Sequence, residues 1–164
     1  LINIDENGLI KVFDKCLENI DCDTQIHLHS LSQSIIPLKT ENIDILTCEY
    51  ASDNSNVISK RILDTYDKFI RVGITRTNLN SIMAEALDSG VPHERFKKYE
   101  GMLELIDSKE QIKKNLQKAL NHYHERLKYV GPDCGLSAWE PPQLASELLN
   151  RTNEAIKEFK QTII

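Results

Sequence analysis

The chain has 164 residues, of which 40% are hydrophobic and 27% are charged, and its formal net charge is -5. This length suits one compact domain, and the composition is too polar for a membrane protein. The acidic balance and the lack of a basic stripe with interleaved aromatic residues argue against a nucleic-acid partner. The four cysteines form no Cys-x-x-Cys pair and no segment resembles a secretion signal, so we expect reduced thiols in a cytoplasmic protein.

Short apolar runs alternate with longer amphipathic segments along the chain. Residues 8–20 place apolar side chains at helical spacing and predict a helix, and residues 24–29 predict a strand. A short helix is expected from residue 31 towards 38, where Pro37 limits it. The almost continuous apolar start of residues 43–49 predicts a second strand that is buried on both faces, as in a parallel sheet.

The same alternation continues through the middle of the chain. Residues 56–68 have a helical pattern, and residues 69–74 predict a third strand. Between 76 and 107 the pattern indicates one or two short helices, which the Gly- and Pro-containing stretch "SGVPHE" interrupts.

The last third of the chain carries the clearest signals. Ser108 and Gln111 form a capping box at the start of a helix over 109–124. The fourth strand is predicted at 126–131, and two prolines suit the first turn of a final helix over 141–161. Apolar residues define the buried faces of these two helices: Ile112, Leu116, Ala119, Leu120 and Tyr123 in the first, and Leu144, Leu148, Ile156 and Phe159 in the second.

The predicted order is one helix followed by four βα units. Such alternation favours parallel strands joined by right-handed crossovers. Periodicity alone permits either a small doubly wound sheet or part of a (β/α)8 barrel. Because a whole barrel takes about 250 residues, the barrel interpretation makes this chain about half of one.

Candidate ligands follow the predicted strands, where ligands bind in both architectures. His27 and His29 are two residues apart on one strand, so their side chains point to the same side. Glu49 and Cys134 follow the second and fourth strands. Together they offer the nitrogen, oxygen and sulfur donors that suit tetrahedral Zn²⁺, so we predict a zinc site, although ordinary packing explains the same spacing. Cys48 should point away from Glu49 and be buried.

Other polar residues near the strand ends are weaker candidates. Thr75, Arg76 and Asp133 are expected to line a substrate pocket, while a structural ion pair is an equally good interpretation of Arg76. The sequence has no nucleotide-binding glycine motif, no His-Glu-x-x-His helix and no serine-hydrolase elbow. The remaining histidines are expected to be solvated: His93, His122 and His124.

Three segments resemble the cobalamin-independent methionine synthase family. "YVGPDCGL" resembles the Asn-Pro-Asp-Cys-Gly-Leu type segment near the carboxyl terminus of these enzymes and of their shorter archaeal relatives. "TQIHLHS" resembles the family's His-x-Cys strand, and "ILTCEYA" resembles its glutamate-bearing strand. The resemblance runs the length of the chain and implies that residues 1–164 are the carboxyl-terminal half of the catalytic (β/α)8 barrel, its last four βα units. The first residue, Leu1, also leads us to expect part of a longer protein.

In this family a zinc ion held by His, Cys, Glu and Cys binds the thiol of homocysteine, so the resemblance implies Glu49 and Cys134 as ligands. The family's His-x-Cys is His27-x-His29 in this chain. In one register His27 is the family's histidine and His29 replaces the cysteine. In the other, His29 is that histidine and Leu31 stands at the cysteine position. We predict the first register, because it keeps both donors on one face of the strand.

The resemblance also implies an activity and its partners. The expected enzyme is a methyltransferase of the methyltetrahydropteroyltriglutamate–homocysteine type, which moves a methyl group from methyltetrahydrofolate or a methyl-corrinoid to homocysteine to make methionine. The family's folate- and amino-acid-binding carboxylates belong to the earlier barrel strands. The missing half of the barrel is expected from the rest of the natural chain or from a second copy. Two alternatives are an enzyme acting on another thiol, such as coenzyme M, and a vestigial metal-binding fragment without catalysis.

Overall fold

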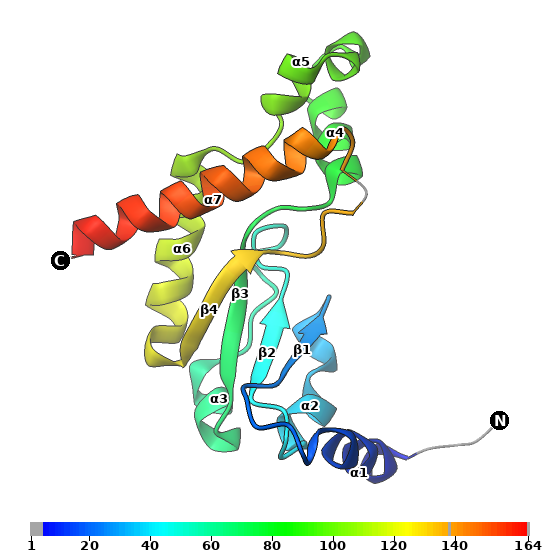
Figure 1. The fold of residues 1–164 in the computed structure, drawn as a ribbon, viewed down its shortest axis with the longest axis vertical. Coiled ribbons are helices and arrows are strands. Elements are labelled where there is room, and N and C mark those ends of the chain that lie inside the picture. Colours follow the sequence, from blue (N-terminus) through cyan, green and yellow to red (C-terminus); the bar gives the residue numbers. More distant parts are fainter. Residues whose placement is uncertain (1–4, 138, 164) are drawn as a thin grey trace.

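The computed structural model describes residues 5–137 and 139–163, and it shows an α/β fold built on one parallel sheet. The four strands lie side by side in chain order, β1-β2-β3-β4, and each neighbouring pair is parallel (Figure 1). All four predicted strands are present, with ends within two residues of those expected. Their bounds are Gln25–Leu28 for β1, Ile45–Cys48 for β2, Phe69–Thr75 for β3 and Leu127–Pro132 for β4.

The helices follow the predicted alternation, and the structure defines their ends. Some are shorter than expected: the helix predicted over 56–68 is seven residues long, because Ser59 caps its start and Asp67 ends it in a left-handed conformation. The bounds are α1 Glu6–Leu17, α2 Ile35–Lys39, α3 Lys60–Tyr66, α4 Leu79–Asp88, α5 Tyr99–Leu103, α6 Lys109–Tyr123 and α7 Pro142–Ile163, with 3-10 turns at Leu31–Gln33, His93–Lys97 and His124–Arg126.

The two faces of the sheet differ in chemistry. Residues that are paired across parallel strands point to the same face, and successive residues point to opposite faces. One row, Leu28, Cys48, Val72 and Val130, belongs to the main hydrophobic core. The neighbouring row, His27, Thr47, Arg71 and Tyr129, therefore lies on the opposite face and is polar.

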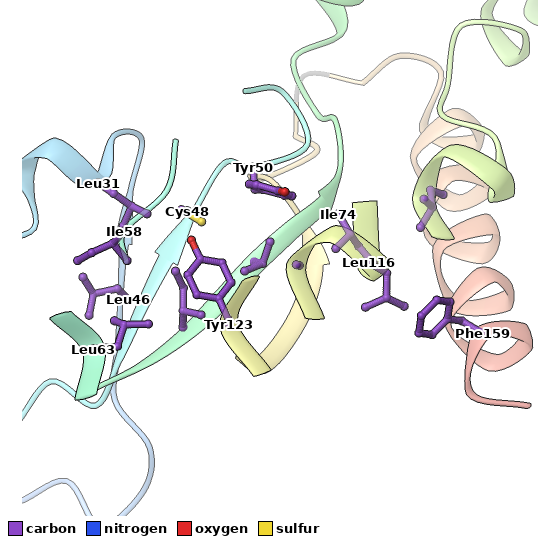
Figure 2. Close-up of a cluster of buried hydrophobic side chains, with 14 of the residues drawn as sticks. Leu31, Leu46, Cys48, Tyr50, Ile58, Leu63, Ile74, Leu116, Tyr123 and Phe159 are labelled. Carbon is purple, nitrogen blue, oxygen red and sulfur yellow. The ribbon is translucent and has the colours of Figure 1, made fainter. Parts of the chain in front are cut away.

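The main core joins the apolar face of the sheet to the helices. Figure 2 shows Leu46 and Cys48 of β2 with Tyr123 of α6 and Phe159 of α7 in this cluster. Leu38 of α2 and Leu63 of α3 also belong to it, so α2, α3, α6 and α7 all contribute to one cluster on this face. Cys48 is fully buried, as predicted, and burial raises the pKa of its thiol to about 12.

The two long helices α6 and α7 cover the β3–β4 side of the sheet. Ser108 caps α6 as predicted, since its hydroxyl accepts a hydrogen bond from the Gln111 amide at 3.2 Å. The predicted apolar faces of both helices are buried or partly buried. Glu158 of α7 makes ion pairs with Lys109 and Lys113 of α6, at 2.7 and 2.6 Å, which join the helices at their exposed edge.

A second buried cluster anchors the segment that follows β4. Trp139 packs there with Ile82 of α4, Met102 of α5 and Leu144 of α7. Its indole nitrogen donates a hydrogen bond to the Thr77 carbonyl oxygen at 2.7 Å. This contact ties the end of the Cys134-bearing segment to the turn after β3.

Across residues 5–137 and 139–163, none of the helices has the length and apolar character needed to cross a membrane.

Candidate metal centre

Three of the four predicted ligands lie together at the carboxyl ends of the strands. His27 belongs to β1, Glu49 directly follows β2, and Cys134 lies two residues after the end of β4. Each offers one ligand atom, and these atoms lie within 4.8 Å of one another. His27 Nε2 is 3.5 Å from Glu49 Oε1. The parallel arrangement thus gathers residues that are 107 positions apart in the chain (134 minus 27).

His29 lies beside this group and contacts one of its members, Glu49. Its Nδ1 is 2.6 Å from the same Glu49 oxygen, and its side chain is 76% exposed. The rings of His27 and His29 meet edge to face, with centroids 5.0 Å apart. The prediction that His29 is itself a ligand stays a prediction. The hydrogen bond to Glu49 is the contact expected of a residue that orients a ligand carboxylate.

The donor set fits a zinc ion chemically. Imidazole nitrogen, carboxylate oxygen and cysteine sulfur are the donors that proteins use for Zn²⁺. Catalytic zinc sites commonly have three protein ligands and keep the fourth position for water or substrate. His27, Glu49 and Cys134 would provide such a three-ligand set, and His29 offers a further donor beside it through its contact with Glu49.

Asp133 connects the two segments that carry Glu49 and Cys134. Its side chain is buried, and one carboxylate oxygen accepts a hydrogen bond from the Ala51 amide at 3.0 Å. The other accepts from the amide and the hydroxyl of Ser52, at 2.8 and 2.7 Å. Burial raises the pKa of Asp133, while the hydrogen bonds from Ser52 and Ala51 lower it. The predicted pocket residue therefore also holds the turn after β2 against the turn after β4.

Gly73 of β3 makes room for this connection. A Cβ at this position would lie 1.9 Å from Oδ1 of Asp133 and 2.6 Å from its Cα, which no real side chain tolerates. Gly73 was not among the residues predicted from the sequence to matter for the site. A glycine inside an otherwise apolar strand was the available signal, because such a residue often marks the close approach of another segment.

Arg71 is a second residue near the site that was not predicted from the sequence, and it is polar. Its side chain extends from β3 over Gly131 of β4, where a Cβ would lie 2.6 Å from Nη2 of Arg71. Nη2 donates a hydrogen bond to the Pro132 carbonyl oxygen at 3.0 Å. An open hollow of about 510 Å³ adjoins the metal ligands and is lined by Gln25, His27, Thr47, Arg71, Asp133, Cys134 and Gly135.

Thr75 and Arg76 are held by a buried carboxylate. Arg76 makes an ion pair with Asp107 at 2.8 Å, and the Asp107 side chain is 1% exposed. Thr75 donates a hydrogen bond to the same residue at 3.2 Å. Arg76 has the structural role that the sequence left open, and it also lines a small pocket of about 180 Å³ beside Glu49.

The remaining predicted polar residues lie away from this centre. His93, His122 and His124 are exposed, as expected. A ring nitrogen of His122 is 3.1 Å from the Ile58 carbonyl oxygen, so this histidine has a local structural contact.

The fold and the site together define an α/β protein with an all-parallel sheet and a His-Glu-Cys group, able to hold a metal ion, at the carboxyl ends of its strands. Comparison of the chain with protein-family models, with curated proteins and with solved structures gave no significant match.

Proposed function

We propose that this chain is the carboxyl-terminal half of a (β/α)8 barrel and carries the zinc site of a thiol methyltransferase. The observation on which the proposal depends is the convergence of His27, Glu49 and Cys134 from three strands of one parallel sheet. In barrel enzymes the active site is formed at this end of the strands. The resemblance of the three ligand-bearing segments to cobalamin-independent methionine synthases supports the same chemistry.

The arrangement of the sheet supports a barrel half over a doubly wound sheet. Strands in a barrel are adjacent in chain order and carry their helices on the outside only, whereas a doubly wound sheet has helices on both faces and a reversal of strand order. Here the order is sequential, and the core helices pack on one face. β1 and β4 are the edge strands, which a second half barrel would pair and so protect from aggregation.

In the proposed site His27, Glu49 and Cys134 hold the zinc ion. When bound, zinc would supply a positive charge that lowers the pKa of a substrate thiol, so that the thiol reacts as thiolate at neutral pH. His29 orients Glu49 through its hydrogen bond, and Asp133 keeps the two ligand-bearing turns together.

The proposed reaction transfers a methyl group to sulfur. The substrate thiol releases its proton to solvent, and its sulfur forms a bond to the methyl carbon while the bond from that carbon to the donor breaks. The donor keeps the electron pair, and a folate donor takes up a proton at the nitrogen that loses the methyl group. Homocysteine is the proposed acceptor, and a methylated folate or a methyl-corrinoid is the proposed donor. The residues that bind the donor would belong to the other half of the barrel.

Zinc content and methyl transfer together test this proposal. The full-length natural chain, which includes the other half of the barrel, should contain zinc when purified and should form methionine from homocysteine with methyltetrahydrofolate or methylcobalamin. In that chain Cys134→Ala should lose both properties. His93→Ala, an exposed histidine remote from the site, is the control and should keep both. Zinc binding without transfer to homocysteine or to 2-mercaptoethanesulfonate would support the alternative of a non-catalytic metal-binding fragment. Equal zinc in wild type and Cys134→Ala would refute the site.

A further inference from the structure

Arg71 differs from the other partly buried arginines of the described chain in having no acidic partner. Arg76 is paired with Asp107 and Glu85, and Arg126 and Arg151 each have a carboxylate at 2.8 Å. Among residues 5–137 and 139–163, no ion pair within 4.0 Å involves the Arg71 guanidinium. One hydrogen bond, to the Pro132 carbonyl oxygen, orients it. Most of its five donor hydrogens are therefore free to bind another group.

The carboxylate that acts most strongly on the Arg71 pKa is already engaged elsewhere. Burial lowers the pKa of the Arg71 guanidinium below its ordinary value, and the charge of Asp133, which raises this pKa, offsets only part of the shift. Both Asp133 oxygens accept hydrogen bonds from Ala51 and Ser52. A partly buried charge without a close partner costs free energy, and an anion that binds to it recovers that cost.

The free donor hydrogens of Arg71 lie beside the candidate metal centre. Arg71 lies in the same cross-strand row as His27, separated from it by Thr47. Arg71, His27 and Cys134 line one hollow of about 510 Å³, which is within the usual size of small-molecule sites. A guanidinium is planar and binds carboxylate or sulfonate oxygens with two parallel hydrogen bonds.

We propose that this hollow binds the acidic end of the thiol substrate, with Arg71 as the residue that selects thiols carrying a carboxylate or sulfonate group. The proposal rests on the proposed function, since it needs the thiol at the metal ligands. Gln25 and Thr47 line the same hollow and add polar groups to its wall, where the linker of a bound substrate would lie.

Matched thiols test the selection directly. The affinities of zinc-loaded protein for 3-mercaptopropionate and 3-mercapto-1-propanol are measured by calorimetry. We expect wild type to bind the acid about 10- to 100-fold more tightly, as for a charge-assisted hydrogen-bond pair. Arg71→Met should bind both thiols equally, and Arg71→Lys should recover part of the preference. Arg61→Met, which removes an exposed arginine on α3, should behave as wild type. Homocysteine and 2-mercaptoethanesulfonate as further probes distinguish carboxylate from sulfonate.

Several outcomes would overturn the proposal. Equal affinity of wild type for the two thiols would show that Arg71 does not select the acid, as expected if a carboxylate from another segment already neutralises it. An equal loss of affinity for both thiols in Arg71→Met, with no recovery in Arg71→Lys, would show that Arg71 only supports the structure. Zinc content and thermal unfolding of each variant identify a folding defect. If wild type binds zinc but neither thiol, or binds no zinc, the proposed function fails and this proposal with it.

Discussion

Asp133 accepts hydrogen bonds from both the amide and the hydroxyl of Ser52, at 2.8 and 2.7 Å, across the strand that separates them in the sheet. Ser52 follows Glu49 by three residues, and Asp133 directly precedes Cys134. The contact therefore sets the distance between two candidate ligands that come from non-neighbouring strands. Residues that hold metal ligands in place commonly matter for affinity nearly as much as the ligands do.

Asp133→Ala should weaken metal binding without removing a ligand. We expect zinc affinity to fall about 10- to 100-fold, measured by competition with a chromophoric chelator. The free energy of unfolding should fall by about 1–3 kcal/mol, because the partly buried hydrogen bonds from the amides of Ala51 and Ser52 lose their acceptor. Asp53→Ala is the control, since its carboxylate bonds Ser55 at an exposed site and should change zinc affinity little. Unchanged affinity in Asp133→Ala would contradict the role of this contact.

Gly73→Ala should disturb the same contact from the neighbouring strand. The new methyl group would meet Asp133 Oδ1 at 1.9 Å and the Asp133 backbone at 2.6 Å, so the segment that carries Cys134 must shift. We expect a loss of about 1–3 kcal/mol in the free energy of unfolding, as for other overpacked sites, together with weaker zinc binding. Gly135→Ala is the matched control, because its Cβ would meet nothing within 4 Å. Similar unfolding curves for the two variants would count against this account.

Substitution of His27 in β1 and of His29, which follows β1, should affect zinc affinity to different extents. His27 belongs to the three-residue group, whereas His29 contacts Glu49. We expect His27→Ala and Cys134→Ser to abolish stable zinc binding, and His29→Ala to reduce affinity by about 10-fold through loss of the contact that orients Glu49. Metal analysis of the dialysed proteins provides the comparison. Complete loss in His29→Ala would instead support His29 as the fourth ligand.

The ion pairs of Glu158 between α6 and α7 should make the free energy of unfolding depend on pH. Hydrogen bonds from Lys109 and Lys113 lower its pKa from 4.5 to about 2. A depressed carboxyl pKa stabilises the folded state above the unfolded-state pKa, and this contribution is lost as pH falls from about 4.5 towards 2. We expect Glu158→Gln to be less stable than wild type at pH 7 and equal to it near pH 2, in urea unfolding at both values. Glu154→Gln, whose contact with Lys109 is longer at 3.3 Å, should show a smaller difference.

The sequence by itself determined the order of the elements and the face that each long helix buries. Apolar spacing located the four strands and the faces of α6 and α7, because burial of apolar side chains follows the period of the backbone. It also predicted the cap at Ser108 and the burial of Cys48. His27, Glu49 and Cys134 could be chosen as candidates from the sequence because parallel strands bring their carboxyl ends to one edge of the sheet.

The tertiary structure decided which polar residues act together, since these contacts join segments far apart in the chain. Asp133 reaches Ser52 over Gly73. A glycine in a strand can signal that another segment approaches closely, but no local pattern identifies Asp133 and Ser52 as the residues that meet there. Arg71 lies in a strand that was predicted from its apolar residues. Whether a carboxylate lies close enough to pair with Arg71 depends on the three-dimensional positions of its neighbours, and in the described chain its hydrogen bond goes to the Pro132 carbonyl instead. His29 has the two-residue spacing of a ligand, but side-chain packing at the strand end placed its ring nitrogen against Glu49. Periodicity depends on the local backbone, whereas these pairings depend on strand register and on the room left by glycines in neighbouring strands.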